Sequence, residues 1–273
     1  SHVFRGLLTT SLPAWVPVPG ARRYQQTLRR LDQVMYQAIE HNRRQGGTDS
    51  LLSLLLGVVD EETRERMTDS QIRDEAVSIF TAGYDTTAVL LGWLLQRLLE
   101  DPAVLATLQA EIDAKLGSRP PTLADLQALS YARQVLQETL RLHPPIWWLP
   151  RETKEATTID GFRIDAGTQV VLMIYALHHD PAIWEDPERF DPARFGPDRL
   201  TPSQRLAWLP FGGGHHQCIG RDYAMVEMQL LLIRMMQLYH LSPGAGRAAT
   251  PRLAITLKMR DGRGLKLVRR QRD

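Results

Sequence analysis

Residues 211–220 read FGGGHHQCIG and hold Cys218, the single cysteine of the 273-residue chain. The glycines of this stretch carry no side chain and permit positive φ, so the backbone can approach a flat or bulky ligand closely. A long amphipathic run follows, which places Cys218 at the start of a predicted helix. The amides and the dipole of a helix N-terminus favour a thiolate, which acts there either as a nucleophile or as a metal ligand.

Two other uses of the cysteine compete with this interpretation. A lone cysteine is often inert and buried, but a buried cysteine needs no glycine-rich loop. Zinc is the second alternative, and its candidate ligands are His215, His216 and Cys218, with His178 and His179 as further donors. Structural zinc sites use spaced pairs such as CxxC, and adjacent histidines do not easily converge on one ion, so the spacing disfavours zinc.

The composition is that of an ordinary globular protein, with 43% hydrophobic and 23% charged residues. The 33 lysines and arginines nearly balance the 31 acidic residues, so the net charge of +2 gives no case for nucleic-acid binding. One cysteine excludes an internal disulfide, and with it a disulfide-dependent secreted scaffold. The apolar runs LLSLLLGVV and AVLLGWLL are far shorter than the ~20 residues that span a bilayer. We read no signal peptide and expect a soluble, cytoplasmic protein without a membrane segment.

Hydrophobic periodicity predicts a mainly helical fold with minor antiparallel β structure and no internal repeat. The predicted helices cover residues 21–45, 50–57, 68–100, 102–115, 122–128, 130–142 and 220–240. Residues 1–20 predict a loop, and residues 156–175 predict a small antiparallel sheet with Asp-Gly and Ala-Gly turns. Residues 180–210, rich in proline and aromatic side chains, predict an ordered, folded-back loop. Residues 252–270 predict a hairpin around an Asp-Gly turn.

Glu138 and Arg141 lie three residues apart in QETLRLHPP, on one side of the predicted helix 130–142. Glu138 falls three residues after Val135 and four before Leu142, which places it on the apolar stripe. An exposed pair of this spacing would contribute only about 0.2–0.5 kcal/mol. A buried carboxylate, in contrast, needs a partner, because isolating a charge from water costs several kcal/mol.

The predicted helix 68–100 is a poor helix near its middle, in TAGYDTTAVLL, residues 81–91. Gly83 costs about 1 kcal/mol relative to alanine, and the Asp-Thr-Thr that follows is made of weak helix formers. A threonine hydroxyl can also bond back to a carbonyl one turn earlier and bend the helix. Defects at mid-helix often mark a functional groove, although a packing glycine beside a polar face would give the same pattern.

The cysteine loop resembles the haem-binding loop of the cytochrome P450 family, F-x-x-G-x-[RH]-x-C-x-G. The loop residues that carry this resemblance are Phe211, Gly214, His216, Cys218 and Gly220, with Gly212 inside the same loop. The resemblance implies that the Cys218 thiolate is the axial ligand of the iron of haem b. It also implies that His216, as in bacterial soluble members, contacts a haem propionate. Arg151 matches a further position that pairs with a propionate, for which its guanidinium is suited; a surface arginine is the alternative.

Glu138 and Arg141 match the E-x-x-R motif of the same family. In the family this pair is joined by a second arginine from the folded-back loop, and PERF, residues 187–190, supplies that arginine as Arg189. The resemblance therefore implies a three-charge lock on the cysteine side of the haem. We assign these three residues to structure and not to chemistry.

Residues 82–87 of the long helix match the family motif [AG]-G-x-[DE]-T-T. The match implies that this segment crosses the oxygen-binding face of the haem and that Ala82 lies against the cofactor. It further implies that Thr86 holds water near dioxygen and that Asp85 relays protons from solvent. A carboxylic acid within one water of the reacting oxygen suits general acid catalysis.

By resemblance the chain is a haem-thiolate monooxygenase that inserts one oxygen atom of dioxygen into a small organic substrate. A thiolate ligand pushes electron density onto the iron and favours O–O cleavage. No GxGxxG signature for a flavin or nicotinamide appears, so we expect electrons from a separate ferredoxin- or flavodoxin-type donor. Family placement gives a substrate pocket bordered by residues 78–82 and by Ile146, Trp147, Trp148 and Ile255.

The resemblance covers almost the whole chain but only the C-terminal portion of the family's fold, so residues 1–273 are interpreted as a single, incomplete domain. Full-length members carry a large N-terminal portion that completes the distal pocket. The competing class is a non-catalytic remnant, either a helical interaction module or a haem-binding relic without turnover. The intact acid, threonine, ion-pair and cysteine motifs favour the enzyme.

Overall fold

The computed structural model describes residues 20–45, 50–262 and 264–271. The described residues form two units, which divide in sequence between Tyr84 and Asp85. The loop expected for residues 1–20 lies outside the described residues except for Gly20. Where the chain is described, no helix is both long enough and apolar enough to cross a membrane.

The first unit is helical, as its periodicity predicts. It contains α2 (Ala21–Gln45), α3 (Leu51–Gly57) and the first part of α4 (Asp69–Glu100). Ser50 caps α3 by accepting the backbone N–H of Ser53, at 3.1 Å. Arg73 of α4 donates its Nε to Asp32 of α2 at 2.8 Å, so an ion pair joins these two helices.

The second unit is built on helices that the sequence predicts within one or two residues. They are the rest of α4, α5 (Pro102–Leu116), α6 (Ser130–Leu142), α9 (Arg221–Leu238) and the 3-10 helix η1 (Leu123–Gln127). Asp101 caps α5 by accepting the Val104 N–H, and Pro102 follows at the first helical position, where its missing N–H is not needed. The capping residue Asp101 thus marks the start of α5.

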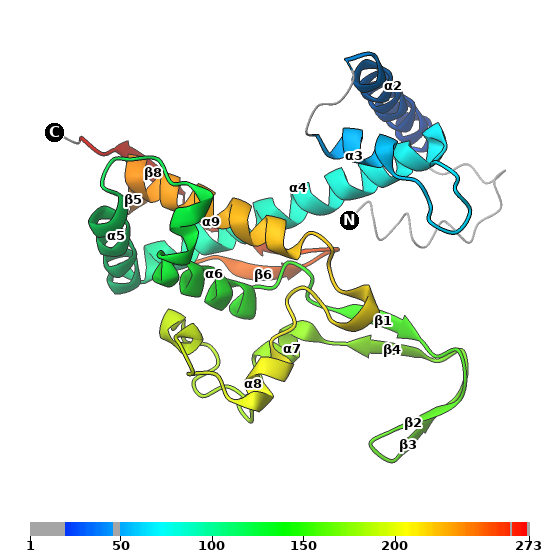
Figure 1. Cartoon of the computed structure of the whole chain (residues 1–273). Coiled ribbons are helices and arrows are strands. Elements are labelled where there is room, and N and C mark those ends of the chain that lie inside the picture. The colour runs from blue at the N-terminus through cyan, green and yellow to red at the C-terminus, as the bar shows by residue number, and fades with distance from the viewer. Residues whose placement is uncertain (1–19, 46–49, 263, 272–273) are drawn as a thin grey trace. The chain divides into compact units, whose positions relative to one another are not determined.

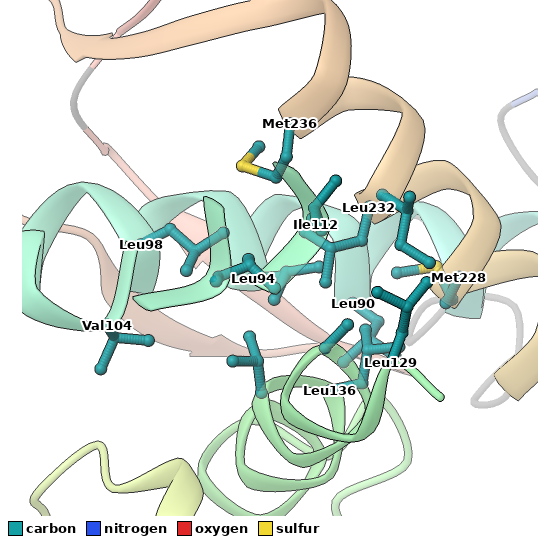
Figure 2. Packing of buried hydrophobic residues seen from close by; sticks show 14 of the residues in the cluster. Leu90, Leu94, Leu98, Val104, Ile112, Leu129, Leu136, Met228, Leu232 and Met236 are labelled. Carbon is teal, nitrogen blue, oxygen red and sulfur yellow. The ribbon is translucent and has the colours of Figure 1, made fainter. Parts of the chain in front are cut away.

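Apolar side chains from α4, α5, α6 and α9 meet in one buried cluster (Figure 2). Leu94, Ile112, Leu136 and Leu232, one from each helix, are fully buried. The helices are apolar on the faces that point inward, and burial of such faces is the main favourable contribution to folding. This cluster is the body against which the cysteine loop is held.

Among the described residues, the strands form four antiparallel pairs. The pairs are β1 (Leu149–Glu152) with β4 (Gln169–Leu172), β2 (Thr157–Ile159) with β3 (Phe162–Ile164), β5 (Tyr239–Pro243) with β8 (Leu265–Arg269), and β6 (Thr250–Leu253) with β7 (Leu257–Arg260). Figure 1 shows the β1–β4 ribbon leading into the β2–β3 hairpin. Asp160 and Gly161 make the turn of that hairpin, with φ of 48° and 81°. The predicted mainly helical fold with minor antiparallel β structure is confirmed.

The predicted hairpin around Asp261 and Gly262 is wrong. Both residues have positive φ, 59° and 115°, so the chain does turn there. The strands on the two sides of the turn nevertheless pair elsewhere. β7 folds back onto β6 across residues 254–256, and β8 pairs with β5, the strand that continues from α9. A turn signal fixes a change of direction, whereas strand pairing depends on segments that are distant in sequence.

The folded-back loop predicted for residues 180–210 contains short helices that its sequence did not predict. They are η2 (Pro192–Phe195) and α8 (Pro202–Ala207), and α7 (Ile174–His178) precedes them. Each is too short to show a helical period, and the two within the loop start at a local cap. Asp191 accepts the Ala193 N–H, and Thr201 accepts the Gln204 N–H.

The shared core gives a test of packing on α9. Replacement of the fully buried Leu232 by alanine removes contacts and leaves a cavity, so we expect Leu232→Ala to lower the free energy of unfolding by about 2–5 kcal/mol. Leu231→Ala, at the adjacent position and 39% exposed, is the control and should change it far less. Urea unfolding measures both, and equal losses would contradict the core assignment.

His143, directly after α6, is a buried histidine whose ring packs against an aromatic side chain. Its ring stacks on the Trp93 indole, with centroids 3.9 Å apart and planes 9° apart, and it is 4% exposed. Among the described residues, neither ring nitrogen has a hydrogen-bond partner. Burial, with the nearby positive charge of Arg97, holds the pKa of His143 well below its ordinary value of 6.5. The folded protein therefore keeps this imidazole neutral.

This neutral imidazole makes the fold sensitive to acid. As the pH falls below about 6.5, the unfolded chain binds a proton at His143 and the folded chain does not, so stability falls. We expect His143→Phe, which keeps a ring on Trp93, to reduce the slope of unfolding free energy against pH by about 1.4 kcal/mol per unit below pH 6. The exposed His240→Gln is the control. A slope that His143→Phe leaves unchanged would contradict the assignment.

Candidate functional site

The cysteine loop, residues 211–220, is closed by its own backbone. The Cys218 N–H donates to the Phe211 carbonyl at 2.9 Å, and the Gln217 N–H donates to the Gly214 carbonyl at 3.1 Å. Gly212 and Gly214 have φ of 71° and 66°, a region that side chains rarely adopt, so the sharp turns of the loop require glycine. Cys218 is exposed and lies three residues before α9 begins.

The base of the loop is fixed to the body of the second unit. Phe211 packs against the core cluster of α4, α5, α6 and α9. A Cβ at Gly212 would lie 3.5 Å from Leu149 Cδ1, so the loop backbone runs close to β1. Arg151 is two residues beyond Leu149 on the same strand and therefore on the same face. It is exposed, and its guanidinium donates to the Pro150 carbonyl at 2.8 Å.

The chemistry of the loop fits a haem iron better than zinc. Cys218 offers a single exposed sulfur, three residues before α9 begins. A Cβ at Gly220 would lie 3.9 Å from the Cys218 Sγ, so glycine keeps that side of the sulfur clear. Within the described ranges, no three or more His, Cys, Asp or Glu side chains gather as a metal site. The ligand set that zinc would need is absent there.

Both ring nitrogens of His178, a candidate zinc donor, make hydrogen bonds to backbone groups. Its Nδ1 lies 3.0 Å from the Arg141 carbonyl and must donate, while its Nε2 accepts the Leu209 N–H at 3.0 Å. This arrangement requires the neutral imidazole. Burial lowers the pKa of His178 to about 3, which agrees with that requirement. His178 therefore links α6 to the segment that leads into the cysteine loop.

Glu138 and Arg141 form a fully buried ion pair on α6. The Arg141 Nε donates to Glu138 Oε2 at 2.8 Å, and its Nη2 donates to Oε1 at 2.9 Å. The backbone N–H of Asp191 donates to the same Oε1 at 3.0 Å. Burial raises the pKa of the Glu138 carboxyl, and the hydrogen bonds from Arg141 and Asp191 oppose that rise. The bidentate geometry satisfies both carboxylate oxygens.

Arg141 also holds the folded-back loop. Its Nη1 donates to the His178 carbonyl at 2.8 Å, and its Nη2 donates to the Arg189 carbonyl at 3.2 Å. The guanidinium carbon lies 5.2 Å from the ring centroid of Trp184, a cation–π contact. One guanidinium thus contacts the last residue of α7 and two points of the folded-back loop.

The arginine expected to complete the lock is a different one. Arg189 is exposed and contributes its carbonyl, whereas the Arg194 Nε lies 3.5 Å from Glu138 Oε1. Arg194 is 13% exposed and also donates to the Asp186 carbonyl at 2.9 Å. The sequence holds two similar strings, PERF at 187–190 and PARF at 192–195. The second string forms η2, and this helix turns the Arg194 side chain toward α6.

Asp85 and Thr86 lie on α4, each partly buried. The Asp85 carboxylate accepts the Thr256 hydroxyl at 2.8 Å and the Lys258 ammonium at 3.0 Å, both from the end of the β6–β7 hairpin. Ala82 belongs to the first unit, where it is an exposed residue of α4. The structure therefore joins Asp85 to the C-terminal hairpin, a connection that the sequence pattern did not predict.

Two of the pocket candidates, Trp147 and Ile255, are brought together at the same hairpin. The Trp147 indole donates to the Ala254 carbonyl at 2.9 Å, and the rings of Trp147 and Trp148 lie 5.7 Å apart. Ile255, next to Ala254, is 51% exposed, whereas Ile146 is half-buried. His216 is exposed on the 3-10 turn η3 (Gly214–His216). Trp147, Ile255 and Asp85 are thus connected through residues 254–258.

Sequence reasoning missed several residues of this arrangement: Arg194, His178, Thr256 and Lys258. The repeated P-x-R-F string could have indicated that two arginines compete for the lock. For the hairpin, the two-residue spacing of Thr256 and Lys258 is compatible with both side chains lying on one side. It does not indicate which residue they contact. The partner, Asp85, is 171 residues away from Thr256, and no local pattern specifies so distant a contact.

A profile of the family described as Cytochrome P450 matches residues 1–259. Cyclooctat-9-en-7-ol 5-monooxygenase of Streptomyces melanosporofaciens is 39% identical over 232 residues, 85% of this chain and 50% of the relative. Cyclooctatin synthase of the same organism is 36% identical over 250 residues, 91% of this chain and 54% of the relative. The chain spans about half the length of these curated relatives.

Solved structures give the same relationship. The heme domain of cytochrome P450DA superposes with a TM-score of 0.83 at 33% identity, covering 91% of this chain and 56% of that chain. A zebra fish cytochrome P450 solved with abiraterone gives a TM-score of 0.77 at 30% identity, covering 88% of this chain and 59% of that chain. The chain therefore shares the fold of part of these heme domains.

The corrected lock can be tested with two arginines of the folded-back loop. We expect Arg194→Ala to lower the free energy of unfolding by about 1.5–3 kcal/mol, because it removes a cation beside the buried Glu138 and a bond to the Asp186 carbonyl. Arg189→Ala retains the carbonyl that Arg141 uses and should have a small effect. Chemical unfolding of the two variants distinguishes them, and a larger loss in Arg189→Ala would reverse the assignment.

Proposed function

The chain belongs to the cytochrome P450 family, and from that premise we propose that it is the thiolate-bearing part of a single haem monooxygenase domain. The observation that carries the proposal is the cysteine loop, where one exposed sulfur is held at the start of α9 by the Cys218 bond to the Phe211 carbonyl. When bound, the haem would supply the activation of dioxygen. All other roles fall to residues of the chain.

Cofactor binding would divide among the loop and β1. The Cys218 Sγ would ligate the iron of haem b, and Gly212 and Gly220 would allow the porphyrin to approach the backbone. Phe211 would anchor the loop in the core, as its packing supports. His216 and Arg151 would hold the propionates. Arg151 shares a strand face with Leu149, which contacts the loop at Gly212, and this placement supports its role.

The buried ion pair of Glu138 and Arg141 would help to hold the cysteine loop in position. Glu138, Arg141 and Arg194 would set the position of the folded-back loop and, through His178, that of the chain entering residue 211. These residues touch no reacting atom in the proposal. They would act on cofactor binding by holding geometry.

Substrate and proton handling would lie with α4 and the hairpin. Thr86 would hold a water near the reacting oxygen. Asp85 would relay protons from solvent to that oxygen. Ala82 would border the cofactor on the same helix. Ile146, Trp147, Trp148 and Ile255 would present apolar and aromatic surface, which suits a small, largely apolar organic substrate. The names of the two Streptomyces relatives, one a monooxygenase acting on cyclooctat-9-en-7-ol, support an apolar substrate class.

The reaction proposed is monooxygenation, in which one oxygen atom enters the substrate and the other leaves as water. Two electrons are needed for each turnover. We propose that they come from a redox partner of the ferredoxin or flavodoxin type, since the family implies such a partner.

Substitution of the ligand tests the central proposal. The reduced, carbon-monoxide-treated chain should show a thiolate-type Soret band, and Cys218→Ser should lose it, because a serine hydroxyl does not replace a thiolate on iron. His215→Gln, a change at an exposed neighbour outside the matched positions, is the control and should keep the band. A band that Cys218→Ser leaves unaltered contradicts the ligand assignment. Absence of any haem band in the unsubstituted chain would favour the non-catalytic alternative, and bound zinc without haem the metal-site alternative.

A further inference from the structure

Both oxygens of the Asp85 carboxylate are held by the β6–β7 hairpin. The Thr256 hydroxyl donates to Oδ2 at 2.8 Å, and the Lys258 ammonium donates to Oδ1 at 3.0 Å. Thr256 is the last residue of the turn between β6 and β7, and Lys258 is the second residue of β7, so both donors come from one side of the hairpin's end. The carboxylate therefore meets a matched pair of donors from one short segment.

That segment is itself fixed in place. The Trp93 indole donates to the Leu257 carbonyl at 2.8 Å, and the Leu257 N–H donates to the Pro145 carbonyl at 2.9 Å. Trp147 holds the Ala254 carbonyl on the other side of the turn. Leu257 is fully buried and Thr256 is 2% exposed. The donors to Asp85 thus stand on a rigid strand start and not on a free surface chain.

The pair remains open to water. The side chain of Asp85 is 38% exposed and that of Lys258 is 41% exposed, so protons can reach the carboxylate from solvent. A second cation, Arg252 of β6, stands opposite Lys258 in the strand register. One turn away on either side in α4, positions 81, 82, 88 and 89 carry Thr, Ala, Ala and Val, so the helix adds no charge.

The electrostatics of the carboxylate follow from these neighbours. Partial burial raises the pKa of Asp85, and the hydrogen bonds from Lys258 and Thr256, with the Lys258 charge, outweigh that effect and lower it. While the pair is intact, the carboxylate stays ionised. Uptake of a proton at Oδ1 removes the charge that attracts Lys258, and release of that proton restores the attraction.

We propose that Lys258 is a positioning residue that returns the Asp85 carboxylate to one orientation after each proton transfer, with Thr256 holding the second oxygen. This inference rests on the proton-relay role proposed above for Asp85. In this inference the β6–β7 hairpin, which also carries Ile255, positions the carboxylate of a residue on α4. Lys258 touches neither substrate nor cofactor in this account and acts through Asp85.

The first test measures the carboxyl itself, without turnover. In the whole 273-residue chain labelled with carbon-13, the Asp85 side-chain carboxyl is identified by its loss in Asp85→Asn and is titrated by NMR. Lys258→Met removes the charge and keeps the stem, and we expect the Asp85 midpoint to rise by about one pH unit. Lys258→Arg should restore most of the lower midpoint. Lys266→Met, an exposed lysine of β8, is the control.

The second test uses the haem-loaded chain supplied with electrons. With the thiolate-type band unchanged, Lys258→Met should lose about tenfold in product formation and return more electrons as hydrogen peroxide. The solvent isotope effect should rise, and Lys258→Arg should recover activity. A merely structural role would leave the isotope effect unchanged.

The outcomes separate the two proposals. Absence of the thiolate-type band in the unsubstituted chain overturns the proposed function, and the relay role of Lys258 with it. A normal band, together with an Asp85 midpoint and an isotope effect that Lys258→Met leaves unchanged, overturns the inference about Lys258 alone. A raised midpoint with a larger isotope effect, both reversed in Lys258→Arg, supports it.

Discussion

The buried ion pair of Glu138 and Arg141 is the interaction on which the geometry of the second unit depends. Two opposite charges out of water are tolerated only when every polar atom has a partner, and here the partners lie on the folded-back loop. Arg141 bonds the His178 carbonyl, while the His178 ring bonds back to the Arg141 carbonyl and accepts the Leu209 N–H. Two residues later the cysteine loop begins. A few directional contacts therefore connect α6 to the segment that carries the sulfur.

Directional bonds matter here because the connecting segment has little regular structure of its own. Apolar packing, as in the cluster of α4, α5, α6 and α9, stabilises a unit but tolerates small shifts of a loop on its surface. Hydrogen bonds to a planar guanidinium fix both distance and angle. Replacement of the pair by apolar side chains could keep the unit folded, yet the loop would lose the contacts that set its position.

Much of this fold follows from the sequence, and the failures share one cause. Long helices were predicted nearly to the residue because their apolar periods repeat over several turns. Glu138 was identified as buried because it stands on such a stripe. The choice of Arg194 over Arg189, the pairing of β8 with β5 and the contact of Asp85 with Lys258 were missed. Each is a contact between segments far apart in sequence, decided by tertiary packing and not by a local pattern. Two P-x-R-F strings look alike until one of them forms η2 against α6.

The two carboxylates of the site show how environment divides roles between similar groups. Glu138 is fully buried and is held by a guanidinium, a backbone amide and a nearby second arginine, so its carboxylate has no direct contact with solvent. Asp85 is more than one-third exposed and is held by one lysine and one hydroxyl. Its ion pair can break and re-form at small cost, because solvent-exposed pairs contribute little. The enclosed carboxylate is thus held as one half of an ion pair, whereas the carboxylate at the edge of water, held by the β6–β7 hairpin, has the exposure that the relay role proposed for Asp85 requires.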